Sequence, residues 1–254
     1  MTGRYVALGS SMAAGPGIKP GAAGAPRLAG RSAANYAHLV AGRLSYDLVD
    51  VTFSGATTAN VLSEPQRGAP PQIEALDGTE SLVTVTIGGN DVGYVPFLLA
   101  AGLPRWVGSV PLLRGALRDR LDVDARIAEL DRVSAPLRSI GRELVARAPS
   151  ARILFVDYLT LLPPAGTAAP PYSAGQLSAA RRIADTLERA TEEAATATGC
   201  EVVRAAAASR EHHAWSPDPW TTRFGLPRPG RPAPLHPNAA GMRAVADLIV
   251  AHLS

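Results

Sequence analysis

Short apolar runs alternate with longer amphipathic stretches along most of the chain. The short runs are rich in Val, Ile and Leu, which is typical of strands buried on both faces. They lie at residues 4–8, 48–53, 82–87, 152–157 and 201–204. The longer stretches carry apolar residues at helical spacing and predict helices over residues 32–44, 174–198 and 238–253. Strands separated by helices predict an α/β fold, with a parallel sheet covered on both faces.

Two stretches interrupt this alternation. Residues 93–124 follow the third strand and include apolar side chains that look exposed, namely Phe97, Leu98, Leu99, Trp106, Val107 and Leu112. Such an apolar insertion either covers a pocket or forms an extra packing helix, and the pattern leaves both open. Residues 205–237 form a Pro-rich loop region that holds three of the five histidines. Because no repeat or linker divides the chain, we expect one domain over residues 1–254.

The composition fits a globular domain with a large core. Hydrophobic residues make up 46% of the 254 residues and charged residues 19%. The net charge of +3 comes mostly from arginines interleaved with acids, as in RGALRDRLDVDAR at 114–126. This pattern is typical of a solvated helix face, so we expect no nucleic-acid partner. No apolar run approaches the roughly 20 residues of a membrane span.

The first residues and the cysteine content indicate where in the cell the protein is expected. The chain opens without a basic, then apolar, then small-residue leader, and residues 6–8 already read as core. Cys200 is the single cysteine, so no internal disulfide can form. We expect a cytoplasmic protein in which Cys200 is a buried structural thiol.

Four short polar blocks follow predicted strands or precede the last helix. They read GSS at 9–11, SGAT at 54–57, GGND at 88–91 and LHPN at 235–238. The carboxyl ends of parallel strands meet at one edge of a sheet, where open α/β folds bind their ligands. The first three blocks are therefore expected to converge, and the C-terminal loop can bring the histidine of the fourth to the same place.

The residue types in these blocks fit acyl transfer to a serine. The hydroxyl of Ser11 becomes a nucleophile when His236 takes its proton. Attack on an ester puts negative charge on the carbonyl oxygen, which needs preorganised donors. The backbone N–H groups of Ser11 and Gly55 and the amide of Asn90 would supply three. Glycine at position 55 lets the backbone approach the oxyanion closely, and we expect Asp91 to brace its loop.

These residues resemble the SGNH hydrolases, also called GDSL esterases and lipases. The four residues of the family name occur in order as Ser11, Gly55, Asn90 and His236, and the resemblance spans residues 4–252. The GGND block is the most specific piece, and its pairing with SGATT resembles the secreted-esterase-like branch. The resemblance implies a three-layer, flavodoxin-like α/β/α sandwich with a five-stranded parallel sheet. It also implies acyl hydrolysis or transfer without a metal or organic cofactor.

Two positions depart from the family pattern. Ser10 stands where the family usually has Asp, which leaves open which serine attacks, and we favour Ser11. The family also places an Asp three residues before the histidine, where this chain has Ala233. We therefore expect a Ser–His dyad whose histidine is oriented by the Ala233 carbonyl. Asp218 or Glu211, from the same loop region, is the alternative.

The sequence thus predicts a cofactor-free serine hydrolase that cleaves carboxylic esters through an acyl-serine intermediate. The apolar insertion predicts a small-molecule ester with a lipophilic acyl part. An acyltransferase or deacetylase, or a silent binding protein on the same fold, remains the alternative. The nucleophile motif G-x-S-x-G of α/β-hydrolases and a dinucleotide-binding G-x-G-x-x-G are both missing. His212 and His213 lack acidic or cysteine partners at ligand spacing, so we expect no metal.

Overall fold

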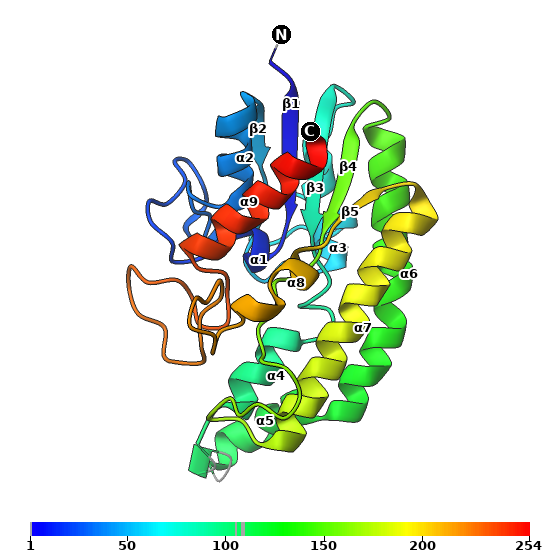
Figure 1. Ribbon diagram of the computed structural model, residues 1–254. Helices are drawn as coiled ribbons and strands as arrows, with labels where there is room; N and C mark the ends of the chain where they lie inside the picture. Colours follow the sequence, from blue (N-terminus) through cyan, green and yellow to red (C-terminus); the bar gives the residue numbers. More distant parts are fainter. Residues whose placement is uncertain (1, 105, 108–109) are drawn as a thin grey trace.

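A computed structural model describes residues 2–104, 106–107 and 110–254, with the backbone alone for 111–114. Its centre is a five-stranded sheet in the order β2-β1-β3-β4-β5 (Figure 1). The strands are β1 (Arg4–Gly9), β2 (Asp47–Asp50), β3 (Glu80–Thr86), β4 (Arg152–Val156) and β5 (Glu201–Val203). Every neighbouring pair is parallel. The predicted α/β fold with five parallel strands is confirmed.

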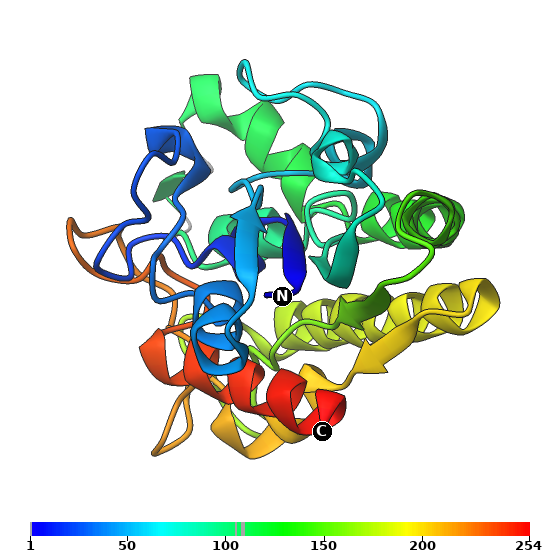
Figure 2. The ribbon, with the colours of Figure 1, turned by 90° about the horizontal axis from the view of Figure 1, so that it is seen from above.

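Long helices cover both faces of the sheet, which gives three layers (Figure 2). Helices α2 (Tyr36–Leu44) and α9 (Ala239–Leu253) contact each other on one face, and α6 (Val123–Arg147) and α7 (Ala174–Thr198) pair on the other. Successive residues of a strand point to opposite faces. In β1, Ala7 therefore packs in the core beneath α2 and α9, whereas the neighbouring apolar residues of the strand face α6 and α7. Both faces are apolar, as the continuous hydrophobic runs predict.

Shorter helices lie at the carboxyl edge of the sheet or beside it. They are α1 (Ser11–Ala14), α3 (Thr58–Leu62), α4 (Tyr94–Ala101), α5 (Pro111–Leu121) and α8 (Ala205–Ala208). Helix α1 follows β1 directly, α4 comes soon after β3, and α8 follows β5. The loops that carry the first three polar blocks therefore begin where parallel strands end, and the fourth block leads into α9.

Two of the element boundaries that differ from the prediction have clear local reasons. The helix predicted from residue 32 begins at Tyr36, because the side chain of Asn35 caps it by accepting a hydrogen bond from the His38 N–H at 3.0 Å. Strand β2 ends at Asp50, whose carboxylate accepts from the Thr52 N–H at 2.9 Å and turns the chain locally. The predicted residues beyond it still run beside β1, since the Phe53 N–H donates to the Gly9 carbonyl at 2.9 Å.

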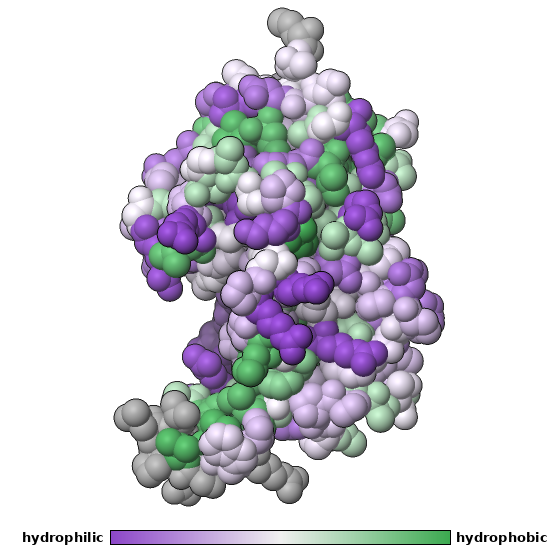
Figure 3. All heavy atoms as spheres, turned by 90° about the vertical axis from the view of Figure 1, so that its left-hand side faces the viewer, coloured by the Kyte–Doolittle hydropathy of each residue, from purple (hydrophilic) through white to green (hydrophobic). Residues whose placement is uncertain are grey.

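The apolar insertion forms the two helices α4 and α5. Phe97 and Leu98, which look exposed in the sequence, are 1% and 0% exposed, so α4 is a packing helix. Trp106 is 70% exposed, in line with the sequence. The side chain of Leu112 lies outside the described residues. Figure 3 shows hydrophobic surface toward the lower end of the molecule, the end at which Figure 1 shows α4 and α5. No helix in the described ranges is long and apolar enough to cross a membrane.

Candidate active site

The structure brings Ser11 and His236 together. The Oγ atom of Ser11 lies 2.8 Å from Nε2 of His236, although 225 positions separate them in the sequence. Gly9 allows the sharp exit from β1: its φ is +140°, and a Cβ there would lie 2.5 Å from the Thr86 carbonyl oxygen. Ser11 is the first residue of α1 and remains 9% exposed. The Ser11 hydroxyl is therefore held against the imidazole of His236, and a small part of Ser11 remains accessible to solvent.

The carbonyl that holds His236 belongs to Pro234, so the expectation for Ala233 is wrong. Nδ1 of His236 lies 2.7 Å from the Pro234 oxygen. The Ala233 carbonyl instead accepts from the Thr222 hydroxyl at 2.6 Å. The physical reason is the backbone of Leu235, whose φ of 60° lies in the left-handed region that non-glycine residues seldom adopt. This turn brings the carbonyl two residues before His236 against its ring.

Neither acid considered as an alternative contacts His236. The Asp218 carboxylate lies 3.4 Å from Nδ1 of His212, and the His212 ring stacks on Trp220 with centroids 4.0 Å apart. Glu211 lines a separate cavity beside α7. Within the described ranges, no carboxylate forms a hydrogen bond or an ion pair with His236. The imidazole is therefore oriented by a neutral carbonyl.

Burial controls the protonation of His236. Desolvation lowers its pKa below the ordinary histidine value of 6.5, and the hydrogen bond to Pro234 works in the opposite direction. A lowered pKa keeps the ring neutral near pH 7. Since Nδ1 faces an oxygen acceptor, the proton of the neutral ring lies on Nδ1, and Nε2 is free to accept the Ser11 proton.

Thr222 fixes the backbone on both sides of Pro234. Its N–H donates to the His236 carbonyl at 2.9 Å, and its Oγ1 accepts from the His236 N–H at 3.2 Å. The same hydroxyl donates to Ala233 at 2.6 Å. Thr222 therefore closes the base of the loop at 223–235 that ends in the histidine. The sequence analysis missed this residue, because nothing in a lone threonine marks it.

Two predicted oxyanion donors, the N–H groups of Ser11 and Gly55, have no acceptor within the described part of the protein. Gly55 adopts φ +83°, which favours glycine. The third, Asn90 Nδ2, donates to the Ala56 carbonyl at 2.8 Å, which orients the amide and leaves its second hydrogen available. The structure therefore ties the Asn90 side chain to the backbone next to Gly55. Available N–H donors of this kind are what a developing oxyanion requires.

Asp91 joins the second and third blocks. Its carboxylate accepts from the Thr58 N–H at 3.0 Å and from the Thr58 hydroxyl at 2.5 Å. Both bonds tie the loop after β3 to the start of α3. The expectation that Asp91 braces its loop is confirmed by these contacts.

Tyr158 joins the first and third blocks and was missed by the sequence analysis. Its hydroxyl accepts from the Gly89 N–H at 2.9 Å and lies 3.3 Å from Oγ of Ser10. A Cβ on Gly89 would lie 2.8 Å from the tyrosine ring, so glycine permits this approach. The Ser10 hydroxyl thus holds the turn before Ser11, at the position where the family has Asp. Tyr158 follows the fourth predicted strand, which is the signal that could have identified it.

The surroundings of the remaining candidate residues indicate a structural role. Cys200 is half-buried, and its Sγ lies 3.4 Å from the Thr198 hydroxyl. Burial raises the pKa of this thiol, as expected of a structural cysteine. In the described ranges, no three side chains of His, Cys, Asp or Glu are grouped to hold a metal ion.

Comparison with known proteins identifies the family. Residues 7–244 match the GDSL-like Lipase/Acylhydrolase family. The chain belongs to this family. It is 32% identical over 260 residues to Lipase 2 of Streptomyces coelicolor, which covers 96% of this chain and 83% of that protein. The GDSL-family chain is therefore a carboxylic ester hydrolase.

Two solved structures share the whole fold of this GDSL-family chain. Phospholipase A1 from Streptomyces albidoflavus NA297 superposes with a TM-score of 0.80 at 27% identity, covering 100% of this chain and 99% of that one. An extracellular lipase from Streptomyces rimosus gives a TM-score of 0.80 at 24% identity, with 99% of each chain covered. The arrangement of all three layers is thus common to this chain and both lipolytic enzymes.

Proposed function

We propose that this protein hydrolyses esters with a lipophilic acyl part through an acyl-Ser11 intermediate, with a Ser11–His236 dyad. The observation that carries the proposal is the 2.8 Å contact between Oγ of Ser11 and Nε2 of His236. This distance lies within the range in which a base can take a proton from a nucleophile. The proposal assigns the role of the acid in a triad to the Pro234 carbonyl, 2.7 Å from Nδ1.

The first half-reaction forms the acyl-enzyme. Nε2 of His236 takes the Ser11 proton as Oγ attacks the ester carbonyl carbon. The negative charge that develops on the carbonyl oxygen is stabilised by the N–H groups of Ser11 and Gly55 and by the amide of Asn90. When the C–O bond to the alcohol breaks, His236 returns its proton to the leaving oxygen.

The second half-reaction repeats these roles with water. His236 takes a proton from water as its oxygen attacks the acyl carbon, and the same donors stabilise the oxyanion. Collapse of this intermediate releases the carboxylic acid and returns the proton to Ser11. A carbonyl lacks the full charge of a carboxylate, so Pro234 stabilises the imidazolium less than an acid would, while it still fixes the tautomer.

An aromatic cluster that begins two residues after Thr222 supports a lipophilic substrate. The Phe224 ring follows Thr222 by two residues and packs edge-on against Tyr172, with centroids 6.2 Å apart. Tyr172 makes a similar contact with Trp215 at 5.9 Å. Phe224 also lies against Gly102, at the end of α4. The rings of Phe224 and Trp215 are half-buried and that of Tyr172 is buried, so aromatic side chains extend from the loop at 223–235 to the apolar insertion, where an acyl chain can be desolvated.

A chain-length series of p-nitrophenyl esters tests the proposal. We expect kcat/KM to rise from the acetyl ester to longer acyl chains. Ser11→Ala and His236→Ala should each lower kcat by about a thousandfold or more, as is typical when a nucleophile or its base is removed. Asp218→Asn and Glu211→Gln serve as matched controls and should keep most activity. A large loss in either control would contradict the dyad, and an active Ser11→Ala variant would contradict the acyl-serine.

A further inference from the structure

The peptide between Ser54 and Gly55 has two possible orientations, and the structure shows one of them. The Ala56 N–H donates to the Phe53 carbonyl at 3.0 Å, which closes a β-turn with Ser54 and Gly55 at its centre. Gly55 has φ +83° and Ser54 has no positive φ, so the turn is of type II. A type I turn joins the same ends with the central peptide turned over. Because glycine adopts either sign of φ, Gly55 permits both orientations and selects neither.

The side chain of Gln66 holds the observed orientation. Its Nε2 donates to the Ser54 carbonyl at 3.1 Å and would lie 3.6 Å from a Cβ on Gly55. The Ser54 carbonyl and the Gly55 N–H belong to one planar trans peptide, so they point in opposite directions. A bond that fixes the oxygen therefore fixes the direction of the N–H. In the turned-over peptide, the Ser54 oxygen would leave Gln66 and the Gly55 N–H would point the other way.

Gln66 lies on a segment that is itself fixed to the sheet. Its backbone N–H and carbonyl both bond to Ala69, each at 2.9 Å, across a tight turn whose two central residues have positive φ. Further along the segment, Gln72 binds the end of β1. Its Oε1 accepts from the Gly9 N–H at 2.7 Å, and its Nε2 donates to the Gly9 carbonyl at 3.0 Å. The amide of Gln66 is therefore presented to the Ser54 carbonyl from a rigid support.

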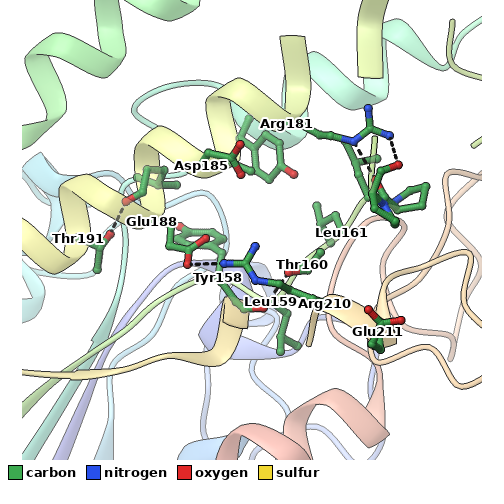
Figure 4. Close-up of a pocket in the computed structure, with 17 residues that line it drawn as sticks. Tyr158, Leu159, Thr160, Leu161, Arg181, Asp185, Glu188, Thr191, Arg210 and Glu211 are labelled. Carbon is green, nitrogen blue, oxygen red and sulfur yellow. Dashed lines mark hydrogen bonds and ion pairs between the residues drawn. The ribbon is translucent and has the colours of Figure 1, made fainter. Parts of the chain in front are cut away.

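Tyr158 supports a different part of the active site. Figure 4 shows this residue among those that line the cavity beside α7, and its hydroxyl contacts Gly89 and Ser10. Neither Gln66 nor Gln72 lines that cavity. The hold of Gln66 on the Ser54–Gly55 peptide is thus separate from the hold of Tyr158 on the serine turn.

We propose that Gln66 is a positioning residue for the oxyanion, because it keeps the Gly55 N–H in the direction that the developing charge requires. This role rests on the proposed function, since it matters only if Gly55 is an oxyanion donor. The other end of the amide contributes nothing to the fold: Oε1 of Gln66 is buried and has no hydrogen-bond partner within the described ranges. An unpartnered buried oxygen costs stability. Removing the amide should therefore affect catalysis more than folding.

Gln66→Met keeps the length of the side chain and removes the amide. The transition state needs the productive orientation of the peptide, so it is stabilised only in the fraction of molecules that retain it. We expect kcat on a p-nitrophenyl ester to fall about tenfold, less than the factor of about 10²–10³ that loss of a whole donor typically costs. KM and the free energy of unfolding in urea should stay unchanged.

An alkyl trifluoromethyl ketone separates positioning from a merely structural defect. Oγ of Ser11 adds to its carbonyl carbon, His236 takes the serine proton, and the carbonyl oxygen becomes an oxyanion. We expect the inhibition constant in Gln66→Met to rise by the same factor as kcat/KM falls, because both need the same donor. The corresponding trifluoromethyl carbinol cannot form the adduct and should bind as it binds the wild type. Fluorophosphonate titration counts the active sites, so a partly unfolded preparation cannot imitate this result.

Gln176→Met is the matched control. Gln176 is half-buried, as Gln66 is, and its Nε2 also donates to a backbone carbonyl, that of Ala101 at 3.3 Å. This variant should keep both kcat and the affinity for the ketone. An unchanged kcat in Gln66→Met, a loss of kcat without weaker ketone binding, or an equal loss in Gln176→Met would overturn the proposal. A wild type that neither hydrolyses esters nor forms the ketone adduct would instead contradict the proposed function.

Discussion

Replacing Thr222 with Val removes the hydroxyl that holds the loop behind the catalytic histidine and keeps the side-chain shape. The Ala233 carbonyl, 2.6 Å from Oγ1, and the His236 N–H, 3.2 Å from it, both lose their partner. A hydrogen bond contributes about 0.5–1.5 kcal/mol net, and an unpaired buried group costs about 1–3 kcal/mol. Because this site is half-buried and water can reach it, we expect the free energy of unfolding to fall by about 1–2 kcal/mol.

The same substitution should slow catalysis without weakening substrate binding. Ala233 and His236 flank Pro234, whose carbonyl orients the imidazole at 2.7 Å. If the loss of this alignment raises the activation free energy by about 1.4 kcal/mol, kcat falls about tenfold, since each 1.36 kcal/mol is a factor of ten in rate. KM should remain unchanged. The assay measures kcat and KM on a p-nitrophenyl ester, together with urea unfolding of the same preparation.

Two neighbouring variants control this experiment. Thr222→Ser keeps the hydroxyl and should retain most activity. Thr221→Val alters the adjacent threonine, which is 1% exposed and whose hydroxyl has no hydrogen-bond partner in the described ranges, so it should cost little. An unchanged kcat in Thr222→Val, despite lower stability, would refute the reasoning. So would an equal loss of kcat in Thr221→Val.

Three further predictions concern protonation and the bracing of the active site. The pH profile of kcat/KM should have an acidic limb with a midpoint below 6.5, because burial lowers the pKa of His236 and the neutral ring acts as the base. Burial raises the pKa of Asp157 to about 7 from 3.8, so its protonated form stabilises the fold. Relative to Asp157→Asn, wild-type stability measured by urea unfolding should therefore fall as pH rises from about 4 to 7. Tyr158→Phe removes the hydrogen bonds to Gly89 and Ser10, which should raise the activation free energy by about 1 kcal/mol. We therefore expect steady-state assays to show kcat lowered about fivefold.

Each of these predictions has an outcome that contradicts it. An acidic limb centred above 6.5 would show that His236 is stabilised as a cation, as a carboxylate partner would do. Parallel pH dependences of unfolding for wild type and Asp157→Asn would show that Asp157 titrates alike in the folded and unfolded chain. An unchanged kcat in Tyr158→Phe would show that the Tyr158 hydroxyl plays no part in positioning the serine turn.

The hydrophobic pattern was sufficient to predict the sheet and the meeting of the first three polar blocks. Parallel strands buried on both faces leave a continuous apolar signature, and their carboxyl ends must share an edge. His236 was added to these blocks because the C-terminal loop can reach the same edge and because the residues match the family pattern. Contacts within the loops carry no such signature. Tyr158 and Thr222 act through hydroxyl groups whose partners are set by the fold, not by neighbours in sequence.

The error at Ala233 has the same origin. The family usually has an acid three residues before the histidine. We therefore expected the residue at this spacing from His236, Ala233, to supply the acceptor for Nδ1. The actual acceptor is decided by the left-handed backbone of Leu235, which is buried and lacks the glycine that would have marked such a turn. In a similar way, Phe97 and Leu98 look exposed in the sequence but are buried once α4 packs on the core.

The central claim is that one serine hydroxyl, activated by one imidazole, forms the covalent intermediate. Mass-spectrometric mapping of the adduct after fluorophosphonate labelling tests it most directly, with wild type and His236→Ala compared under the same conditions. The account predicts a single adduct on Ser11 in the wild type and much slower labelling when the imidazole is missing. An adduct on Ser10, or equally fast labelling of both proteins, would contradict it.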